Sequence, residues 1–314
     1  MNSNIVCPLC SSGRMDIITD KVRFGKKANV YKCGDCSLVF VDQKSFSFPT
    51  DFYEKEYHQT YLTHVEPDAL NPDIYYEKMK KANRIWADKF CDMLTGRETV
   101  LDMGCSTGHF IDMVKHKTKK IYGYDLNTKE IDFCISRGLD VSGKPLKESF
   151  KDKTFDYITL IYVLEHIADP KSFLLSIKPF LKRSGKLIIL VPNVRDALIG
   201  FYDIPEFKDF YYCIEHLFYY SPATIRLLFE SVGLKGEIET IQEYPLTNHL
   251  SWIYRRAPSN VLASRAGIPD VALTESTRDE EWNQLWKNFN NRYVEFLGIN
   301  GFGDRIWCSV GFED

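Results

Sequence analysis

Short, predominantly apolar runs alternate along the chain with segments of helical periodicity. The apolar runs occupy residues 100–103, 120–124, 155–161, 185–191 and 305–312. The near-continuous run at residues 155–161 is typical of a strand buried on both faces of a parallel sheet. Helix signals lie between them, with caps at Asn127, Asp169-Pro170 and Ser221-Pro222 and stops at Gly138 and Gly233. Strands that alternate with helices in this way predict a doubly wound α/β fold.

A helical insertion is predicted at about residues 245–300, before the last strand. Thr277 and Glu280 have the spacing of a capping box, and Gly298 ends the helix. Apolar side chains fall along one face of this helix, at Trp282, Leu285, Trp286, Phe289, Tyr293 and Phe296. An aromatic stripe at this spacing indicates a helix face packed into the core rather than a set of substrate contacts.

Residues 49–95 form a predicted helical link that is rich in tyrosine and charge. Trp86, Phe90 and Leu94 have the spacing of one face of an amphipathic helix. We expect this helix to cover a cleft in the α/β domain. Three further side chains of the link are placed in the same pocket, namely Tyr53, Tyr57 and His58.

The composition narrows the class of protein. The 314 residues are 44% hydrophobic and 14% aromatic, enough for a substantial core. A formal net charge of −3 provides no basic field to gather nucleic acid, so no nucleic-acid partner is expected. The chain shows neither an apolar run of membrane-spanning length nor a signal-peptide pattern at its N-terminus, so we expect a cytoplasmic protein with no membrane partner.

Two C-x-x-C pairs stand close to the N-terminus. They supply Cys7, Cys10, Cys33 and Cys36, four of the nine cysteines in the chain. Two such pairs can present four thiolates to one tetrahedral ion and leave no position for a water ligand. The pattern predicts a zinc ribbon over residues 1–48, in which structural Zn²⁺ compensates for a missing core, in a reducing compartment.

The run from Val100 to Phe110 reads as a strand, a glycine turn and the start of a helix. Gly104 and Gly108 are spaced G-x-x-x-G, whereas a dinucleotide-binding turn has G-x-G-x-x-G, so NAD and FAD are disfavoured. The next strand ends at Asp125, where folds of this type place an acid against ribose hydroxyls. These features predict a nucleotide-containing cofactor at the ends of two neighbouring strands.

The sequence D-x-G-x-x-x-G, from Asp102 to Gly108, resembles motif I of class I S-adenosylmethionine-dependent methyltransferases. Residues 163–170 and 191–193 resemble strand ends of the same family. The resemblance implies a Rossmann-like seven-stranded methyltransferase domain over residues 96–314, with S-adenosyl-L-methionine as cofactor. In that family the glycines let the backbone approach the methionine part of the cofactor. The resemblance assigns cofactor contacts to Asp102, Gly104, Cys105, Gly108, Asp125, Leu126 and Tyr162.

The ribbon and the segment 215–221 are similar to those of sugar and nucleotide-sugar methyltransferases. This resemblance implies methyl transfer to a hydroxyl of a sugar, a nucleotide sugar or a glycan precursor of polysaccharide biosynthesis. His216 would accept the hydroxyl proton, with Glu215 beside it and His166 as the second candidate, and the rate would rise with pH through a histidine ionisation. Tyr162 replaces the first carboxylate of the E-x-x-E-H magnesium site of ubiquinone-type O-methyltransferases, so no catalytic metal is expected.

Other activities remain open at this point. An RNA or protein methyltransferase with a zinc ribbon is one alternative, although Val191-Pro192-Asn193 is not the motif of base amino-group methylation. C-methylation of a sugar is another, and a phosphoramidate-type acceptor is a third, with Lys208, Arg195 and Arg226 as its possible anion site. A binding module with an inactive methyltransferase core is a further possibility.

Overall fold

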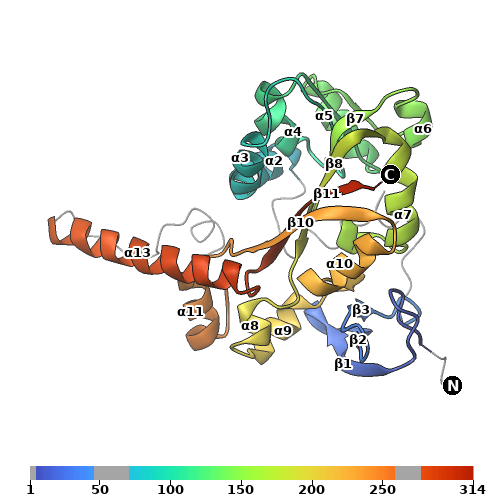
Figure 1. Ribbon diagram of the computed structural model, residues 1–314. Helices are drawn as coiled ribbons and strands as arrows, with labels where there is room; N and C mark the ends of the chain where they lie inside the picture. The colour runs from blue at the N-terminus through green and yellow to red at the C-terminus, as the bar shows by residue number, and fades with distance from the viewer. Residues whose placement is uncertain (1–4, 46–70, 259–276, 314) are drawn as a thin grey trace.

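The computed structural model describes residues 5–45, 71–258 and 277–313, and Figure 1 shows their arrangement. The predicted pocket residues Tyr53, Tyr57 and His58 lie outside the described residues. The centre of the fold is a seven-stranded sheet with the order β10-β11-β8-β7-β4-β5-β6. Five strands are parallel, namely β4 (Thr99–Met103), β5 (Lys120–Tyr124), β6 (Val141–Ser142), β7 (Phe155–Ile161) and β8 (Leu181–Pro192). β11 (Arg305–Phe312) runs antiparallel to both β8 and β10 (Leu234–Ile241).

Helices cover both faces of this sheet, as the continuous apolar runs predict. The helices around it are α4 (His109–Val114), α5 (Thr128–Ser136), α6 (Leu146–Ser149), α7 (Pro170–Ile177) and α10 (Pro222–Glu230), with short 3-10 turns at Lys115–Lys117, Leu164–His166 and Lys178–Phe180. Strand β8 shows the two faces, because Ile188 packs with α3 and α4 whereas Ile189 packs with α7 and α10. The α/β fold with a seven-stranded sheet is therefore confirmed.

The predicted helix caps are present in the structure. Asn127 accepts hydrogen bonds from two backbone N–H groups at the start of α5, and Asp169 accepts one at the start of α7. Ser221 forms a reciprocal capping box with Thr224 at the start of α10. These short polar side chains satisfy helix N-terminal donors that have no partner inside the helix, so each start is fixed locally.

A second, four-stranded sheet contains the N-terminal residues. Its order is β1-β2-β3-β9, from β1 (Met15–Val22), β2 (Lys26–Cys33), β3 (Val39–Val41) and β9 (Phe218–Tyr219), with a 3-10 turn at Arg23–Gly25. In the chain, strand β9 lies between β8 and β10 of the large sheet, yet it pairs with β3. Apolar residues of the small sheet also pack on α8 (Ala197–Gly200), α9 (Pro205–Tyr211) and α11 (Leu246–Arg255). The ribbon thus shares its sheet and its core with distant parts of the chain.

Three further helices depart in part from the sequence expectation. Trp86 and Phe90 of α3 (Arg84–Cys91) are fully buried under the large sheet, so α3 packs on the sheet rather than covering a cleft. It is α2 (Pro72–Ala82) that faces the cleft described below. Helix α13 (Thr277–Ile299) extends away from the body in Figure 1. Within the described residues, we find no helix that combines the length and the apolar character needed to cross a bilayer.

The prediction that the aromatic stripe of α13 packs into the core is wrong for most of its members. Trp282, Leu285, Phe289 and Phe296 remain between 47% and 57% exposed. Tyr293 is the member that does turn inward, where its hydroxyl contacts His249 and Tyr202. The helix is attached to the body by a neighbouring face, because Leu297 is buried and Asn290 accepts a hydrogen bond from the backbone of Leu246.

Candidate functional site

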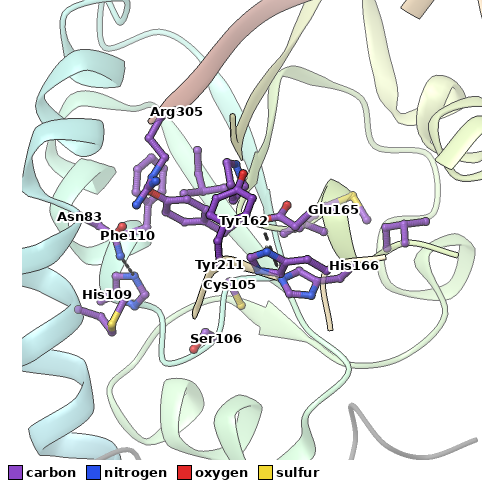
Figure 2. Close-up of a pocket in the computed structure, with 18 of the residues that line it drawn as sticks. Asn83, Cys105, Ser106, His109, Phe110, Tyr162, Glu165, His166, Tyr211 and Arg305 are labelled. Carbon is purple, nitrogen blue, oxygen red and sulfur yellow. Dashed lines mark hydrogen bonds and ion pairs between the residues drawn. The ribbon is translucent and has the colours of Figure 1, made fainter. Parts of the chain in front are cut away.

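A cavity of about 930 Å³ opens at the carboxyl ends of β4, β5 and β7. This is the edge at which doubly wound sheets bind ligands, and the volume is near the upper end for small-molecule sites. Side chains of α2, α9 and α11 complete the wall, together with the 3-10 turn at Arg23–Gly25, here called the ribbon turn. In Figure 2, His109 and Asn83 lie at one side of the cavity, and Glu165 and His166 lie at the other.

The glycine turn after β4 lines the cavity where β4 and β7 end. Gly104 has φ +74°, and a Cβ there would lie 2.5 Å from Cγ2 of Val163, so a side chain is excluded at this position. Asp125 accepts hydrogen bonds from the backbone N–H of Ser106 at 2.8 Å and of Asn127 at 2.9 Å. The carboxylate of Asp125 therefore holds the turn and also lines the cavity.

The other predicted cofactor residues occupy different positions around this turn. Asp102, Cys105 and Leu126 line the cavity. The Asp102 carboxylate accepts a 2.6 Å hydrogen bond from Thr159, and burial raises its pKa to about 7. Gly108 does not line the cavity. A Cβ at Gly108 would lie 2.4 Å from Cδ1 of Leu139, so the glycine is needed for packing at the start of α4. Gly108 thus allows close packing of the helix rather than contact with a ligand.

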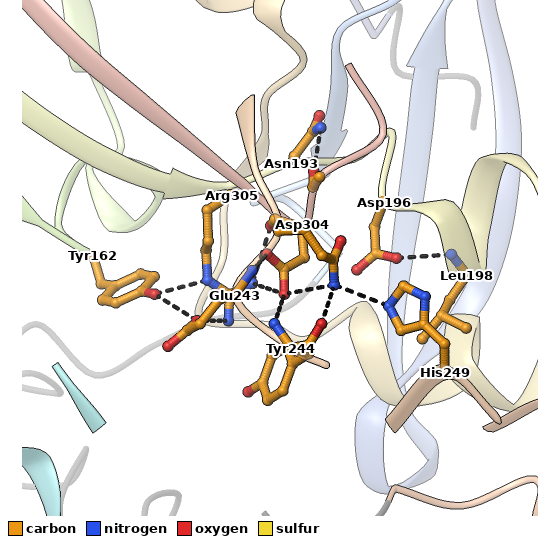
Figure 3. A network of polar contacts seen from close by, with 11 residues as sticks. Tyr162, Asn193, Asp196, Leu198, Glu243, Tyr244, His249, Asp304 and Arg305 are labelled. Carbon is orange, nitrogen blue, oxygen red and sulfur yellow. Dashed lines mark hydrogen bonds and ion pairs between the residues drawn. The ribbon is translucent and has the colours of Figure 1, made fainter. Parts of the chain in front are cut away.

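Tyr162 lines the cavity from the end of β7 in a left-handed backbone conformation, with φ +58°. Its hydroxyl accepts a 2.7 Å hydrogen bond from Nε of Arg305, whose guanidinium also pairs with Glu243 at 3.0 Å (Figure 3). The carboxylate of Asp304, next to Arg305 in the chain, accepts hydrogen bonds from the backbone N–H groups of Glu243 and Tyr244. This buried network ties the start of β11 to the segment before α11 and holds Tyr162 at the cavity wall. A strained backbone at such a place is typical of functional sites.

The two predicted histidines meet at the opposite side of the cavity. The rings of His166 and His216 lie 4.9 Å apart, edge to face, although 49 residues separate them in the chain. Nδ1 of His166 lies 2.9 Å from the backbone oxygen of Glu215, which can only accept, so the proton is on Nδ1 and Nε2 is an acceptor. Nε2 of His166 is 4.0 Å from the Glu165 carboxylate. One ligand atom each of Glu165, His166 and His216 lie within 4.8 Å of one another, a spacing that a metal ion also accepts.

Glu215 acts on this pair through its backbone. Its side chain is 2% exposed and does not line the cavity, whereas its carbonyl fixes the tautomer of His166. Burial lowers the pKa of both His166 and His216 to about 3. The predicted histidine ionisation thus moves well below neutral pH. Burial also raises the pKa of Glu165 to about 8, so this carboxyl, beside the pair, changes charge near neutral pH.

Polar groups without partners gather at this end. Within the described residues, both carboxylate oxygens of Glu165, Nδ1 of His216 and the hydroxyl of Tyr211 are buried and have no hydrogen-bond partner. All three residues line the cavity. Buried polar groups are rarely left unpaired in folded proteins, and a bound ligand is one way to satisfy them.

The sequence did not indicate the outer wall of the cavity. Phe207, Phe210 and Trp252 supply aromatic surface, and Asp196 supplies a buried carboxylate. The ribbon turn adds Arg23 and Phe24, and the Arg23 guanidinium lies 4.2 Å from the centre of the Phe210 ring. Of these residues, only Asp196 could have been suspected from the sequence, because it is an acidic residue shortly after the end of a predicted strand. The possible anion site is not assembled here, because Lys208, Arg195 and Arg226 do not line the cavity.

The four ribbon cysteines converge as their spacing predicts. Sγ of Cys7 lies 3.5 Å from Sγ of Cys36, and Sγ of Cys10 lies 3.5 Å from Sγ of Cys33. These separations exceed a disulfide bond and approach the value of about 3.8 Å for thiolates around one tetrahedral zinc ion. The donor set therefore fits a closed structural metal site.

Comparison with known proteins identifies the large domain. The family model described as "Methyltransferase domain" matches residues 75–237. Among curated relatives, a ubiquinone biosynthesis O-methyltransferase of Idiomarina loihiensis is 27% identical over 41% of this chain and 58% of that protein. An uncharacterised protein of Methanocaldococcus jannaschii is 34% identical over 36% of this chain and 48% of that protein. The chain spans about half the length of these two relatives.

Solved structures show similar chains as well. A crystal structure of a methyltransferase from Archaeoglobus fulgidus, described as dependent on S-adenosylmethionine, is 22% identical. It covers 76% of this chain and 94% of its own, with a TM-score of 0.46. The family match includes β4 with its glycine turn, Asp125 and the strand end at Glu165, and it spans just over half of the 314 residues. The chain therefore belongs to the class I S-adenosylmethionine-dependent methyltransferases.

Proposed function

We propose that this methyltransferase transfers a methyl group to a hydroxyl of a sugar, a nucleotide sugar or a glycan precursor. The observation that carries the proposal is the set of unpaired polar groups at the histidine end of the cavity, on Glu165, His216 and Tyr211. A polyhydroxylated acceptor can supply the matching hydrogen-bond donor or acceptor to each of them. The aromatic surfaces of Phe207 and Trp252 would suit the apolar face of a pyranose ring.

The cofactor would lie along the glycine turn, with its ribose at Asp125. When bound, S-adenosylmethionine supplies an electrophilic methyl group. The residues of this chain would hold the acceptor hydroxyl in line with that methyl group, and the neutral ring of His216 would take up the hydroxyl proton as the methyl group is transferred. The protein mainly has to align the two ligands and exclude water, and a positioned base adds to the rate.

We also propose that the four ribbon thiolates bind one structural Zn²⁺. The support is their convergence at tetrahedral spacing, with no position left for a water ligand. The role of this zinc would be structural rather than catalytic, because none of the four cysteines lines the cavity.

The decisive experiment is a screen of nucleotide sugars for a cofactor-dependent gain of one methyl group, measured by mass spectrometry. We expect at least one nucleotide sugar to be methylated, and the fragmentation pattern to place the methyl group on a sugar oxygen. A catechol is the contrasting acceptor in the same screen, because some relatives are named for ubiquinone and demethylmenaquinone methylation. Methylation of the catechol with every nucleotide sugar left unchanged would overturn the sugar assignment.

The pH profile should report Glu165 rather than a histidine. The pKa of Glu165 is raised to about 8, so its carboxyl is neutral below that pH and becomes anionic above it. The anion would stabilise the imidazolium that forms on proton transfer, so turnover is expected to rise through about pH 8. Glu165→Gln should remove this rise, whereas Glu148→Gln, at an exposed carboxyl of α6, should retain it. A rise centred near the ordinary histidine pKa instead would contradict this account.

A further inference from the structure

Helix α13 carries an exposed apolar stripe outside the cavity. Its members are Trp282 (51% exposed), Leu285 (47%), Phe289 (56%), Phe296 (57%) and Ile299 (78%). None of them lines the cavity. The stripe runs about 25 Å along the helix, at 1.5 Å per residue, beside the face that attaches α13 to the body. In Figure 1 the helix stands out from the body as an arm.

The spacing of the stripe is that of a coiled-coil seam. Trp282, Phe289 and Phe296 repeat every seven residues, and Leu285, Arg292 and Ile299 follow them at three residues. These two sets correspond to the a and d positions of a heptad. Such a seam requires a second helix of similar length with knobs that match its own.

The order of these residues is also self-complementary. If two copies of α13 lie antiparallel with the two-fold axis between residues 290 and 291, Trp282 faces Ile299 of the second copy and Leu285 faces Phe296 of the second copy. The central layer then pairs Phe289 with Arg292 of the second copy, twice. Every a position meets a d position, and both sides of the interface are the same surface, as a closed two-fold dimer requires.

Charge and area agree with this pairing. Arg292 is exposed and has no ion pair among the described residues, so its guanidinium is available to lie over the Phe289 ring of the other copy. Aromatic side chains present roughly 150 to 250 Å² each. Two half-exposed stripes of this composition would bury on the order of 1,000 Å² in total, which is the lower limit for a specific interface.

We propose that the chain forms a homodimer through antiparallel pairing of α13 about residues 290 and 291. The two cavities stay independent, because the seam contributes no residue to either one. The proposal is separate from the choice of acceptor, so it does not depend on the sugar assignment.

Analytical ultracentrifugation of the full chain, from low to high micromolar concentration, tests the association. We expect the mass of two chains for the unchanged protein and of one chain for Phe289→Glu. The matched control is Ile135→Glu on α5, which changes an equally exposed (56%) apolar residue far from the arm and should remain dimeric. Circular dichroism and cofactor binding establish that both variants are folded. A single-chain mass at every concentration, or a dimer that survives Phe289→Glu, would overturn the proposal.

Crosslinking tests the register. Chains with Leu285→Cys and chains with Phe296→Cys are mixed and mildly oxidised, with the unchanged protein as the background for its native cysteines. The mixture should form disulfide-linked pairs in high yield, because positions 285 and 296 face each other. Leu285→Cys alone should not, since two copies of position 285 are offset by eleven residues, or about 16 Å, far beyond disulfide reach. Equal crosslinking of Leu285→Cys alone would show that the antiparallel pairing is wrong.

Discussion

Replacing Cys33 and Cys36 together by serine is expected to unfold the N-terminal ribbon and abolish methyl transfer. Structural zinc contributes about 10 to 16 kcal/mol of apparent binding free energy in small zinc domains, which is folding free energy when the apo segment has little core. The loss should reach the cavity, because Val41 of the ribbon donates its backbone N–H to Leu217, directly after His216. Strand β3 then pairs with β9. The ribbon is thus one of the supports of the predicted base.

Elemental analysis, hydrogen exchange and a turnover assay check this prediction. Elemental analysis should give about one zinc per unchanged chain and none in the double variant. Hydrogen exchange should become fast over β1 to β3 and at β9 in the variant. Cys91→Ser, outside the thiol cluster, is the matched control and should keep both zinc and protection. If the double variant retains protected ribbon amides and full turnover, the ribbon does not depend on the metal.

His216→Ala is expected to lower turnover by about 10²- to 10⁴-fold, the usual contribution of a positioned general base. Cofactor affinity should be unchanged, because the proposed cofactor contacts are made by the glycine turn and by Asp125, not by His216. Asp125→Ala should show the reverse pattern. It removes charge-assisted hydrogen bonds, each worth roughly 1.5 to 3 kcal/mol, so affinity should fall while bound enzyme still turns over.

Calorimetry with the cofactor and single-turnover kinetics separate these two outcomes. His166→Ala is the closest comparison, since its ring touches that of His216 and its Nδ1 is already used by the Glu215 carbonyl. We expect a smaller loss there, because His166 mainly shapes the wall beside the base. A His216→Ala enzyme that keeps more than about a third of its turnover would transfer the role to His166 or leave alignment alone as the source of the rate.

The sequence alone determined features that depend on local rules. Asn127, Asp169 and Ser221 were identified as helix caps because each satisfies donors only two or three residues away. The glycine turn followed from backbone conformation, and the thiol cluster followed from the ligand geometry of C-x-x-C pairs. The near-continuous apolar run at residues 155–161 indicated a buried parallel strand, because burial on both faces requires nearly continuous hydrophobicity, whereas the run at 305–312 forms a strand that is antiparallel to its neighbours. These patterns are short in range, so one sequence suffices to read them.

The tertiary structure decided which distant segments meet. His166 and His216 were both noted in the sequence, but only the fold brings their rings into contact and fixes one tautomer through the Glu215 backbone. Burial then displaced their pKa and that of Glu165, which no local pattern can show. The sequence also led to the wrong expectation that the apolar stripe of α13 packs into the core. Periodicity reveals an apolar face, but whether the body or a second chain covers it depends on where the fold places the helix.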